Sequence, residues 1–483
     1  MKTLLFLVLC WGTSFAVAQA TAGMSPNVIF ILADDLGYNE IGPYGQTKIR
    51  TPNLDSLAES GITFSQFYAG APVCATSRSV LMTGQHAGHT RVRGNAFPED
   101  NGKQELLDED FTLAELFKTA GYKTALVGKW GLGMQNTQGH PNKQGFDHFF
   151  GYLSQHHAHN YYPTYLWRNE LKVGLPNINL PMGNGRIYGA GVAPIHGRNL
   201  YAPDLFVEEA VDFINQNATE PFFLYFATNV PHSNNEATQL RRADGAEVPD
   251  LGRYQEEAWQ EGAKRHAAMI TRMDGDIGTI IETLESLNIR ENTIIVFSSD
   301  NGPHVDHTEP LEFFEPSEPL IGWKMELAEG GLRVPTIISW PSLIETPRQS
   351  NAVAYFGDFM ATFAAILGVE APDDLDSNSF LPVLKREHEA FVSSEFLYWE
   401  FNGKDKGVVV LMDGRWKGIL RSRVVNGHRR AAPFELFDLH NDIKEVNDVS
   451  ALHPEISAAI LDYMKKARTH SENWPPVIDF TTY

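Results

Sequence analysis

Apolar runs of strand length recur along the first three quarters of the chain. Asn27 to Ala33 (NVIFILA) is a continuous apolar run bounded by Asp34-Asp35, which is typical of a strand buried on both faces of a sheet. Three further runs of this kind are predicted as strands, at residues 124–128, 221–228 and 293–298.

Helical patterns lie between these runs. Thr51 and Pro52 begin a short helix that ends at Gly61, residues 111–120 form another before Gly121, and residues 256–287 carry apolar side chains at helical spacing. Strands that alternate with helices predict an α/β fold, built on a large mixed, mostly parallel sheet that helices flank.

The pattern changes near residue 370. Residues 371–374 (APDD) are typical of a linker, residues 408–420 predict a hairpin that turns at Asp413-Gly414, and a helix is expected from about Pro454 to Ala467. These features predict a main domain over residues 21–370 and a smaller C-terminal α+β subdomain over residues 371–483.

The first twenty residues have the pattern of a signal peptide. Lys2 precedes an apolar stretch, and Ala18-Gln19-Ala20 matches a cleavage site. A membrane anchor would need about 20 apolar residues, and polar residues interrupt this run earlier, so no membrane span is expected. The sequence therefore predicts a secreted or periplasmic protein, in which Cys74 is the one cysteine that remains after residues 1–20 are removed.

Composition and charge exclude several classes of protein. The chain has 483 residues, 43% of them hydrophobic and only 2 of them Cys, which is globular composition and argues against a disordered or disulfide-stapled protein. Lys and Arg number 39 against 60 Asp and Glu, a formal net charge of -21. Because a nucleic-acid partner requires a clustered basic face, none is expected.

Acidic and amide side chains follow two of the predicted strands. Asp34 and Asp35 follow the first strand, and Asp300 and Asn301 follow the strand at 293–298. In a parallel sheet these strand ends share one edge, where ligands bind. Each pair alone is equally consistent with a turn, but together they form an oxygen-only ligand set that favours Ca²⁺, with Mg²⁺ or Mn²⁺ as the alternatives.

The lone cysteine lies in the segment PVCATSRSVLMTG. If Cys74 begins a helix that runs towards Gly84, Arg78 lies one turn further on the same face, and the helix N-terminus and the guanidinium suit an oxyanion. The other interpretation is a buried structural cysteine on an ordinary helix.

These motifs together resemble the formylglycine-dependent (type I) sulfatases, the arylsulfatase-like group of the alkaline-phosphatase superfamily. The family signature is Cys-x-Pro-x-Arg followed by an apolar pair and Thr-Gly. The resemblance covers nearly the whole mature chain, in the blocks NVIFILADDLG, TPNLDSLAESGITFSQFYAGAPVC, GKWGLG, PH, SDNG, and Lys324 through EGGLRVP.

The resemblance implies a role for each matching residue. Cys74 is the residue that a maturation enzyme oxidises to formylglycine, whose hydrate attacks sulfur. The implied calcium ligands are Asp34, Asp35, Asp300, Asn301 and residue 74. Arg78 and Lys129 are expected to hold the hydrate and the sulfate, and His232 and Lys324 to contact the sulfate and the leaving oxygen.

Two positions depart from the family pattern. Thr76 replaces the usual Pro of the signature, which bears on how fully Cys74 is converted, and Gly131 stands where the family has a His that acts as a base. The nearby cluster His156, His157 and His159 offers an imidazole in its place, or a supporting or sugar-binding role.

The expected activity is hydrolysis of sulfate esters, with a sulfated carbohydrate or a smaller sulfated molecule as substrate. Aromatic residues at 161, 162, 165 and 167 either stack on sugars or pack in the core. Two alternatives stay open: a phosphate or phosphonate ester hydrolase of the same fold, and a non-catalytic protein that binds sulfated glycans through an unconverted Cys74. The sugar, the position of its sulfate and exo versus endo action are not predicted.

Overall fold

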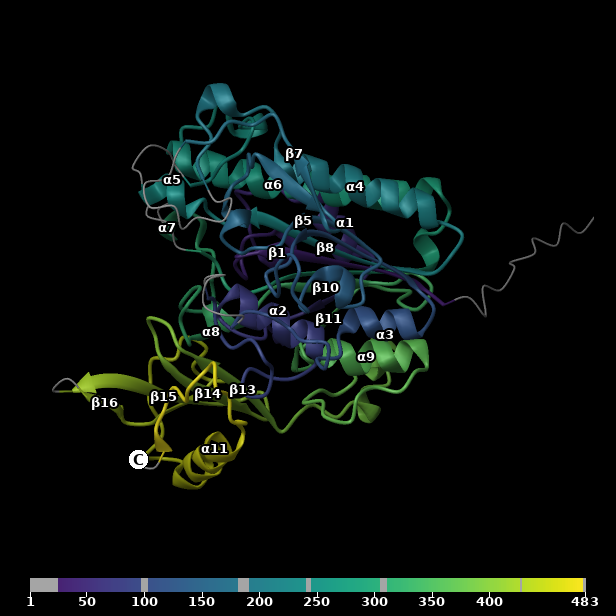
Figure 1. Ribbon diagram of the computed structural model, residues 1–483. Coiled ribbons are helices and arrows are strands. Elements are labelled where there is room, and N and C mark those ends of the chain that lie inside the picture. The colour runs from purple at the N-terminus through teal and green to yellow at the C-terminus, as the bar shows by residue number, and fades with distance from the viewer. Residues whose placement is uncertain are drawn as a thin grey trace, which may run out of the picture.

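The computed structural model describes residues 25–96, 103–180, 191–239, 245–304, 311–425 and 428–480. A central sheet has helices on both faces, and a smaller unit of strands with one helix lies beside it (Figure 1). The expected α/β fold with a C-terminal subdomain is confirmed. The predicted signal peptide lies outside the described residues and stays a prediction, as does the boundary at residue 370.

The large sheet has ten strands in the order β11-β2-β10-β9-β1-β8-β4-β5-β6-β7. Its centre is parallel, because β9, β1, β8, β4 and β5 pair with one another in the same direction. These five strands are Thr293–Ser299, Asn27–Asp34, Phe222–Pro231, Lys123–Lys129 and His148–Tyr152. The outer strands are β11 (Arg348–Ser350), β2 (Ile62–Phe64), β10 (Thr336–Ser339), β6 (Tyr165–Arg168) and β7 (Leu171–Gly174). A separate pair joins β3 (Phe67–Tyr68) to β12 (Ala354–Tyr355).

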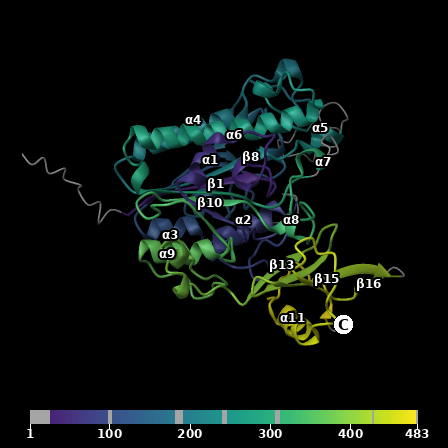
Figure 2. The same ribbon diagram turned by 180° about the vertical axis from the view of Figure 1, so that it is seen from behind.

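The helices cover both faces of this sheet. They are α1 Pro52–Glu59, α2 Cys74–Thr83, α3 Leu113–Thr119, α4 Ala202–Asn217, α5 Asn235–Gln239, α6 Glu261–Ser286, α7 Leu311–Phe314, α8 Glu329–Leu332, α9 Asp358–Leu367, α10 Leu381–Leu384 and α11 Pro454–Lys466. Figures 1 and 2 show α1, α4 and α6 on one face and α2, α3 and α9 on the other. The predicted strands and helices are confirmed to within a few residues, while α4 and α9 are absent from the prediction.

The apolar run of β1 explains why both faces must be covered. Successive side chains of a strand point to opposite faces. Val28, Phe30 and Leu32 therefore enter the core on the α2, α3 and α9 side, whereas Ile29 and Ile31 enter the core under α4 and α6. All five are fully buried, so the strand holds a central place in the sheet.

The C-terminal subdomain has its own sheet and core. Its strands are β13 Phe396–Phe401, β14 Gly407–Met412, β15 Trp416–Val425, β16 His428–Ala431 and β17 Glu435–Asp438. The predicted hairpin is β14 and β15, and it turns at Asp413 and Gly414, whose φ values are 52° and 65°. Helix α11 packs on this sheet through Ile460 and Met464.

Four buried charged residues join this subdomain to the main domain, and we call them the interdomain cluster: Glu329, Arg333, Lys417 and Glu445. Lys417 Nζ lies 3.0 Å from Glu329 Oε1 and 2.8 Å from Glu445 Oε1. Arg333 Nε donates to Glu329 Oε2 at 2.7 Å. Burial alone would raise the pKa of Glu329, but Lys417 and Arg333 lower it to about 2.

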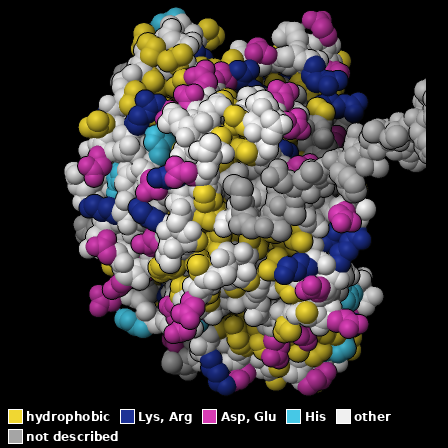
Figure 3. Space-filling model, turned by 90° about the vertical axis from the view of Figure 1, so that its right-hand side faces the viewer, with side chains coloured by type: hydrophobic (Ala, Val, Ile, Leu, Met, Phe, Trp, Pro, Cys, Tyr) yellow, Lys and Arg dark blue, Asp and Glu magenta, His cyan; other side chains and the backbone are white. Residues whose placement is uncertain are grey.

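Two further features concern membrane-spanning helices and the distribution of charge on the surface. No helix within the described ranges is both long and apolar enough to cross a membrane. Figure 3 shows the side of the molecule from which the chain enters β1, where cationic and acidic side chains are interspersed.

Candidate active site

Four neighbouring parallel strands each have a polar residue at or just after their carboxyl end, and these residues lie at one edge of the sheet. Asp34 is the last residue of β1, Lys129 is the last of β4, His232 follows β8, and Asp300 follows β9. Because β9, β1, β8 and β4 are adjacent, these side chains meet although they are far apart in sequence. The expected convergence at the carboxyl ends of the strands is therefore present.

Helix α2 brings the signature segment to the same point. Cys74 is its first residue, and Gly84 ends it in the left-handed conformation with φ of 70°. Arg78, one turn after Cys74, donates from Nε to Asp300 Oδ2 at 2.9 Å and from Nη1 to the Lys129 carbonyl at 2.6 Å. The buried guanidinium thus links the ends of β9 and β4.

Lysine side chains pair with the first two carboxylates. Lys129 Nζ donates to both oxygens of Asp34, at 2.9 and 2.7 Å. Lys324 Nζ donates to Asp35 Oδ2 at 2.6 Å and lies 3.0 Å from His232 Nε2. All nine predicted site residues lie within this one cluster.

The oxygen atoms of the cluster surround Cys74. Its Sγ lies 3.5 Å from Asp34 Oδ1 and 3.6 Å from Asp35 Oδ1. Ligand atoms of Asp34, Asp35, Cys74 and Asp300 all lie within 4.8 Å of one another. Asn301 donates its Nδ2 to Asp35 Oδ1 at 2.8 Å, whereas its buried Oδ1 has no hydrogen-bond partner in the described part of the chain. An unpaired acceptor beside clustered carboxylates fits a bound cation.

Burial and charge shift the pKa values of these groups in different directions. Burial alone would raise the pKa of Asp34, but Lys129, Arg78 and Lys324 together lower it well below its usual value. Burial and the Asp34 carboxylate raise the pKa of Asp300 to about 7. Burial and Asp300 also raise the pKa of the Cys74 thiol well above its usual value. An added cation would favour the ionised form of Asp300 and of residue 74.

His232 is held in one orientation by its surroundings. Its Nδ1 donates to the Ser233 carbonyl at 2.6 Å, and its ring stacks on those of His159 and His304 at centroid distances of 4.7 and 5.2 Å. Burial lowers the pKa of His232 well below its usual value, and Lys324 lowers it further. The ring is therefore neutral, with the lone pair of Nε2 directed at Lys324 Nζ.

A cavity of about 270 Å³ opens onto the cluster. Its floor contains Cys74, Lys129 and His232, and its wall includes residues of the C-terminal subdomain. The main-domain residues that line it are Val73, Cys74, Gly94, Asn95, Lys129, Gln155, His156, His159, His232, Asn235, His304, Lys324 and Met325. The subdomain contributes Phe401, Asn402, Gly403 and Trp474.

The histidine cluster divides between the cavity and the core. His156 and His159 line the cavity, and His159 Nδ1 lies 3.1 Å from Glu236 Oε2. His157 is buried against Tyr152 and Tyr165, and burial together with Lys172 lowers its pKa to about 3. An imidazole at 157 thus cannot replace the family base.

The aromatic residues that follow this cluster pack in the interior. Tyr161, Tyr162 and Trp167 are at most 5% exposed and belong to the hydrophobic cores. For these three the packing interpretation is correct and sugar stacking is wrong.

Thr76, which stands where the family signature usually has Pro, is also buried, and its hydroxyl has no hydrogen-bond partner among the described residues.

A second group of possible ligands, His86, His89 and Asp376, connects the end of α2 to the segment after α9. His89 Nδ1 lies 2.8 Å from Asp376 Oδ2, and the two imidazole rings stack at 4.1 Å. The Gly88 amide donates to His86 Nδ1 at 3.0 Å, so the proton of the neutral ring is on Nε2. This tautomer leaves no lone pair on Nε2 for a metal.

Several residues that line the cavity were not predicted from the sequence. His304 lies two residues beyond the SDNG block and could have been found from that position. Gln155, Asn95 and Trp474 carry no local signal, because only the tertiary packing brings them to the cavity.

Comparison with known proteins identifies the class. The family model described as "Sulfatase" matches residues 26–369, and that described as "N-sulphoglucosamine sulphohydrolase, C-terminal" matches residues 323–470. The chain belongs to the sulfatase family, whose members are sulfuric ester hydrolases.

Individual relatives agree with this family. The chain is 30% identical over 373 residues to the human N-acetylgalactosamine-6-sulfatase, an alignment that covers 75% of this chain and 66% of the human protein, just under two thirds. It is 29% identical to the N-acetylgalactosamine-6-O-sulfatase of Bacteroides thetaiotaomicron, over 92% of this chain and 93% of that protein. Among solved structures, that of Ps i-CgsB matches with a TM-score of 0.73 and 28% identity over 92% of both chains.

Proposed function

We propose that this protein hydrolyses sulfate esters of carbohydrates, with a formylglycine derived from Cys74 as nucleophile and a bound Ca²⁺. The observation that carries this proposal is the gathering of Arg78, Lys129 and Lys324 around residue 74, where Cys74 and the two lysines also line the cavity. Fixed cations in a buried site stabilise the negative charge that develops when an alkoxide leaves sulfur.

The substrate class is supported by relatives and by the shape of the site. The curated relatives named above act on N-acetylgalactosamine 6-sulfate groups, and Ps i-CgsB has also been solved with a neocarrahexaose, a structure that matches this chain with a TM-score of 0.71. The cavity wall mixes amide, imidazole and aromatic side chains. Such a wall suits a polar ring better than a flat apolar aryl group.

Conversion of Cys74 is supported by the state of its thiol. Burial and the nearby carboxylates raise the pKa of this thiol, so the unmodified residue would be a weak nucleophile at neutral pH. A formylglycine at this position would supply a hydrated aldehyde, one hydroxyl of which attacks sulfur while the other later releases sulfate.

The proposed cation site consists of Asp34, Asp35, Asp300, Asn301 and residue 74. The donors are oxygens, which suits Ca²⁺ or Mg²⁺ better than zinc. Asn301 Oδ1 provides one ligand atom to which none of the described residues donates a hydrogen bond. When bound, the cation would supply positive charge to the sulfate oxygens and lower the pKa of the hydrate.

The remaining roles follow from the contacts of each side chain. Arg78 positions the carboxylate of Asp300 and the end of β4. Lys129, which lines the cavity, holds a fixed positive charge beside Asp34 and residue 74. Lys324 can donate a proton or a hydrogen bond to the leaving oxygen, and the adjacent neutral His232 can accept one through Nε2.

We also propose that residues 1–20 direct export, so that the mature enzyme meets its substrate outside the cytoplasm and depends on a maturation enzyme for residue 74. N-terminal sequencing of protein from a secreting host tests this point. A chain that begins near Thr21 supports export, whereas a retained N-terminus contradicts it.

A desulfation panel tests the proposed function. The purified protein is incubated with N-acetylgalactosamine 6-sulfate, carrageenan oligosaccharides, an aryl sulfate and an aryl phosphate, and released sulfate or phosphate is measured. The proposal expects sulfate release from at least one sulfated carbohydrate and none from the Cys74→Ala control. Release of phosphate alone would favour the phosphatase alternative, and release from the aryl sulfate alone would contradict a carbohydrate substrate.

A further inference from the structure

Gly131 stands where the family pattern has a histidine, and its surroundings are already filled. It lies two residues after Lys129, with φ of 84°. A Cβ atom at this position would lie 2.1 Å from Gln155 Nε2 and 2.7 Å from Gln155 Cδ. The amide of Gln155 therefore occupies the place where a side chain of residue 131 would begin.

Backbone pairing fixes this arrangement. Gln155 follows β5, the strand next to β4, and Gly131 follows β4. The Trp130 amide donates to the Tyr152 carbonyl at 2.9 Å, and the Gly131 amide donates to the Leu153 carbonyl at 3.0 Å. Because the two strand extensions are hydrogen bonded to each other, the side chain of Gln155 is held over Gly131.

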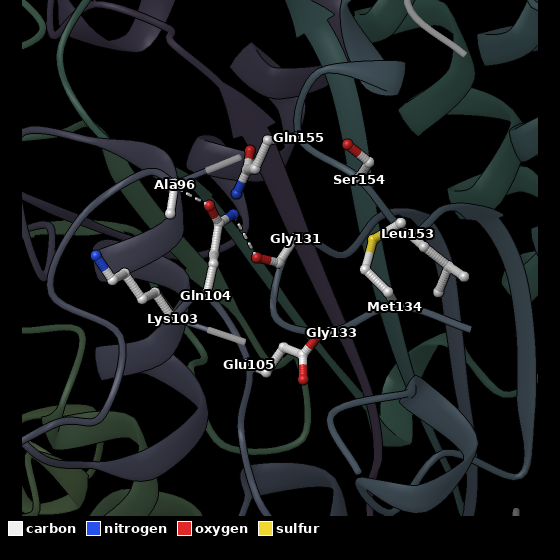
Figure 4. Close-up of a pocket in the computed structure, with 10 residues that line it drawn as sticks. All are labelled: Ala96, Lys103, Gln104, Glu105, Gly131, Gly133, Met134, Leu153, Ser154 and Gln155. Atoms are coloured by element: carbon white, nitrogen blue, oxygen red, sulfur yellow. Dashed lines mark hydrogen bonds between the residues drawn. The ribbon is translucent and has the colours of Figure 1, made fainter. Parts of the chain in front are cut away.

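The amide of Gln155 is buried and unpaired. The residue is 3% exposed, and neither its Nε2 nor its Oε1 has a hydrogen-bond partner among the described residues. Neighbouring Gln104 is different: its Oε1 accepts from the Ala96 amide at 2.6 Å and its Nε2 donates to the Gly131 carbonyl at 2.7 Å (Figure 4). Buried side-chain amides are rarely left unpaired in native proteins.

Gln155 also borders the reaction cavity. It lines the cavity that contains Cys74, Lys129 and His232, as well as the smaller pocket of Figure 4, where its amide points towards Gln104 and Gly131. The amide atoms are buried in this conformation, so a rotation of the Gln155 side chain, with no backbone change, would bring them to a group bound in the reaction cavity.

We infer that Gln155 is a substrate-binding residue, whose amide hydrogen bonds to a hydroxyl or sulfate oxygen of the sugar on the side that a histidine at 131 would serve. This inference rests on the proposed function. An amide donates and accepts hydrogen bonds but does not take up a proton near neutral pH. The site thus binds the substrate at this position and uses no base there.

Replacement of Gln155 by Met, which has similar length and no amide, tests the inference. With the sulfated carbohydrate that the wild type turns over fastest, kcat/KM should fall by about tenfold or more, the loss expected for one or two hydrogen bonds. Gln135→Met, the same change at an exposed residue, is the control and should match the wild type. Conversion of residue 74 and the thermal midpoint should not change in either variant.

A binding measurement separates this contact from catalysis. In the inactive Cys74→Ala background, Gln155→Met should weaken the affinity for the same carbohydrate in calorimetry by a similar factor.

Failure of the substrate contact at Gln155 can be distinguished from failure of the proposed function. If the wild type desulfates a carbohydrate and Gln155→Met has the same kcat/KM and affinity, the role of Gln155 is wrong and the proposed function stands. A lower thermal midpoint with unchanged kcat/KM would show a packing role and would also overturn it. If the wild type desulfates no carbohydrate, the proposed function fails, and with it the substrate contact.

Discussion

The active-site cluster and the interdomain cluster are both buried groups of charged side chains, but they are completed in different ways. In the interdomain cluster, Lys417 and Arg333 lie directly against the carboxylates of Glu329 and Glu445; the pKa of Glu329 falls to about 2, whereas burial raises that of Glu445. In the active site the pKa of Asp34 is likewise lowered and that of Asp300 raised to about 7, but here Asn301 Oδ1 has no hydrogen-bond partner among the described residues and the cluster opens onto a cavity. The first cluster is complete with protein groups alone, whereas the second fits one more cation.

The difference predicts separate consequences for stability and for activity. Breaking a buried ion pair leaves an uncompensated charge and costs folding free energy. A cluster that is shaped for a ligand and a reacting group holds charges whose main effect appears on the transition state. Substitutions in the two clusters therefore distinguish their functions.

The largest effect is expected at residue 74. Cys74→Ala should abolish sulfate release, because no nucleophile remains, while the free energy of unfolding changes little since only a small side chain is lost. Initial rates and urea unfolding of the same preparation check both statements. Residual turnover above background would contradict the role of residue 74.

The next effect concerns the interdomain cluster. Lys417→Met should lower the free energy of unfolding by about 3–5 kcal/mol, because Glu329 and Glu445 then face each other without their shared cation. Lys444→Met is the matched control, since its pair with Glu318 is half exposed and should contribute about 0–1 kcal/mol. Equal losses in the two variants would refute the contrast between buried and exposed pairs.

Lys324→Ala should lower kcat by about 10², because the lysine is placed to stabilise charge on the leaving oxygen, and it should also cost stability, because its ion pair with Asp35 is buried. Lys129→Ala should behave in the same way. Steady-state rates and thermal midpoints measure the two effects. Normal turnover in Lys324→Ala would mean that the residue has been given the wrong role.

The smallest expected effect is a pH dependence of stability, because protons and Ca²⁺ compete for the carboxylate of Asp300. In the metal-free fold, burial and Asp34 raise the pKa of Asp300 to about 7, above the value of about 3.9 for an unfolded chain. Between these two pKa values the folded state binds a proton that the unfolded state releases. The contribution of Asp300 to the free energy of unfolding therefore falls as the pH rises through this range.

Added Ca²⁺ needs the ionised carboxylate, and its stabilisation should therefore grow from pH 5 towards about pH 7. Thermal midpoints with chelator and with Ca²⁺, measured across this range, provide the test. Asp300→Asn should remove the pH dependence. A stabilisation by Ca²⁺ that is constant or falls across the range would contradict the ligand set.

Most of the fold and the charged part of the site could be predicted from the sequence. Buried parallel strands leave long apolar runs, and their polar ends at Asp34 and Asp300 stand out against these runs. Helix α4 was not predicted although its sequence carries the signal: Pro203 stands in its first turn, and the residues buried at helical spacing are Phe206, Ala210, Phe213 and Ile214.

Other parts of the site depend on packing that no local pattern encodes. Gln155 reaches the cavity only because β4 and β5 pair in one register, and Trp474 only because the chain returns from the C-terminal subdomain. The aromatic residues Tyr161 and Tyr162 show the converse, since their sequence suits sugar stacking but their place between the sheet and its helices makes them core.

The central claim is that residue 74 is an oxidised cysteine in the active enzyme, despite Thr76 in the signature. Mass spectrometry of the peptide that spans residue 74, on protein fractions of known specific activity, tests it most directly. The account predicts a peptide in which CH₂–SH has become CHO, at an occupancy that rises in proportion to specific activity. Fully active protein that carries only the intact thiol at Cys74 would contradict it.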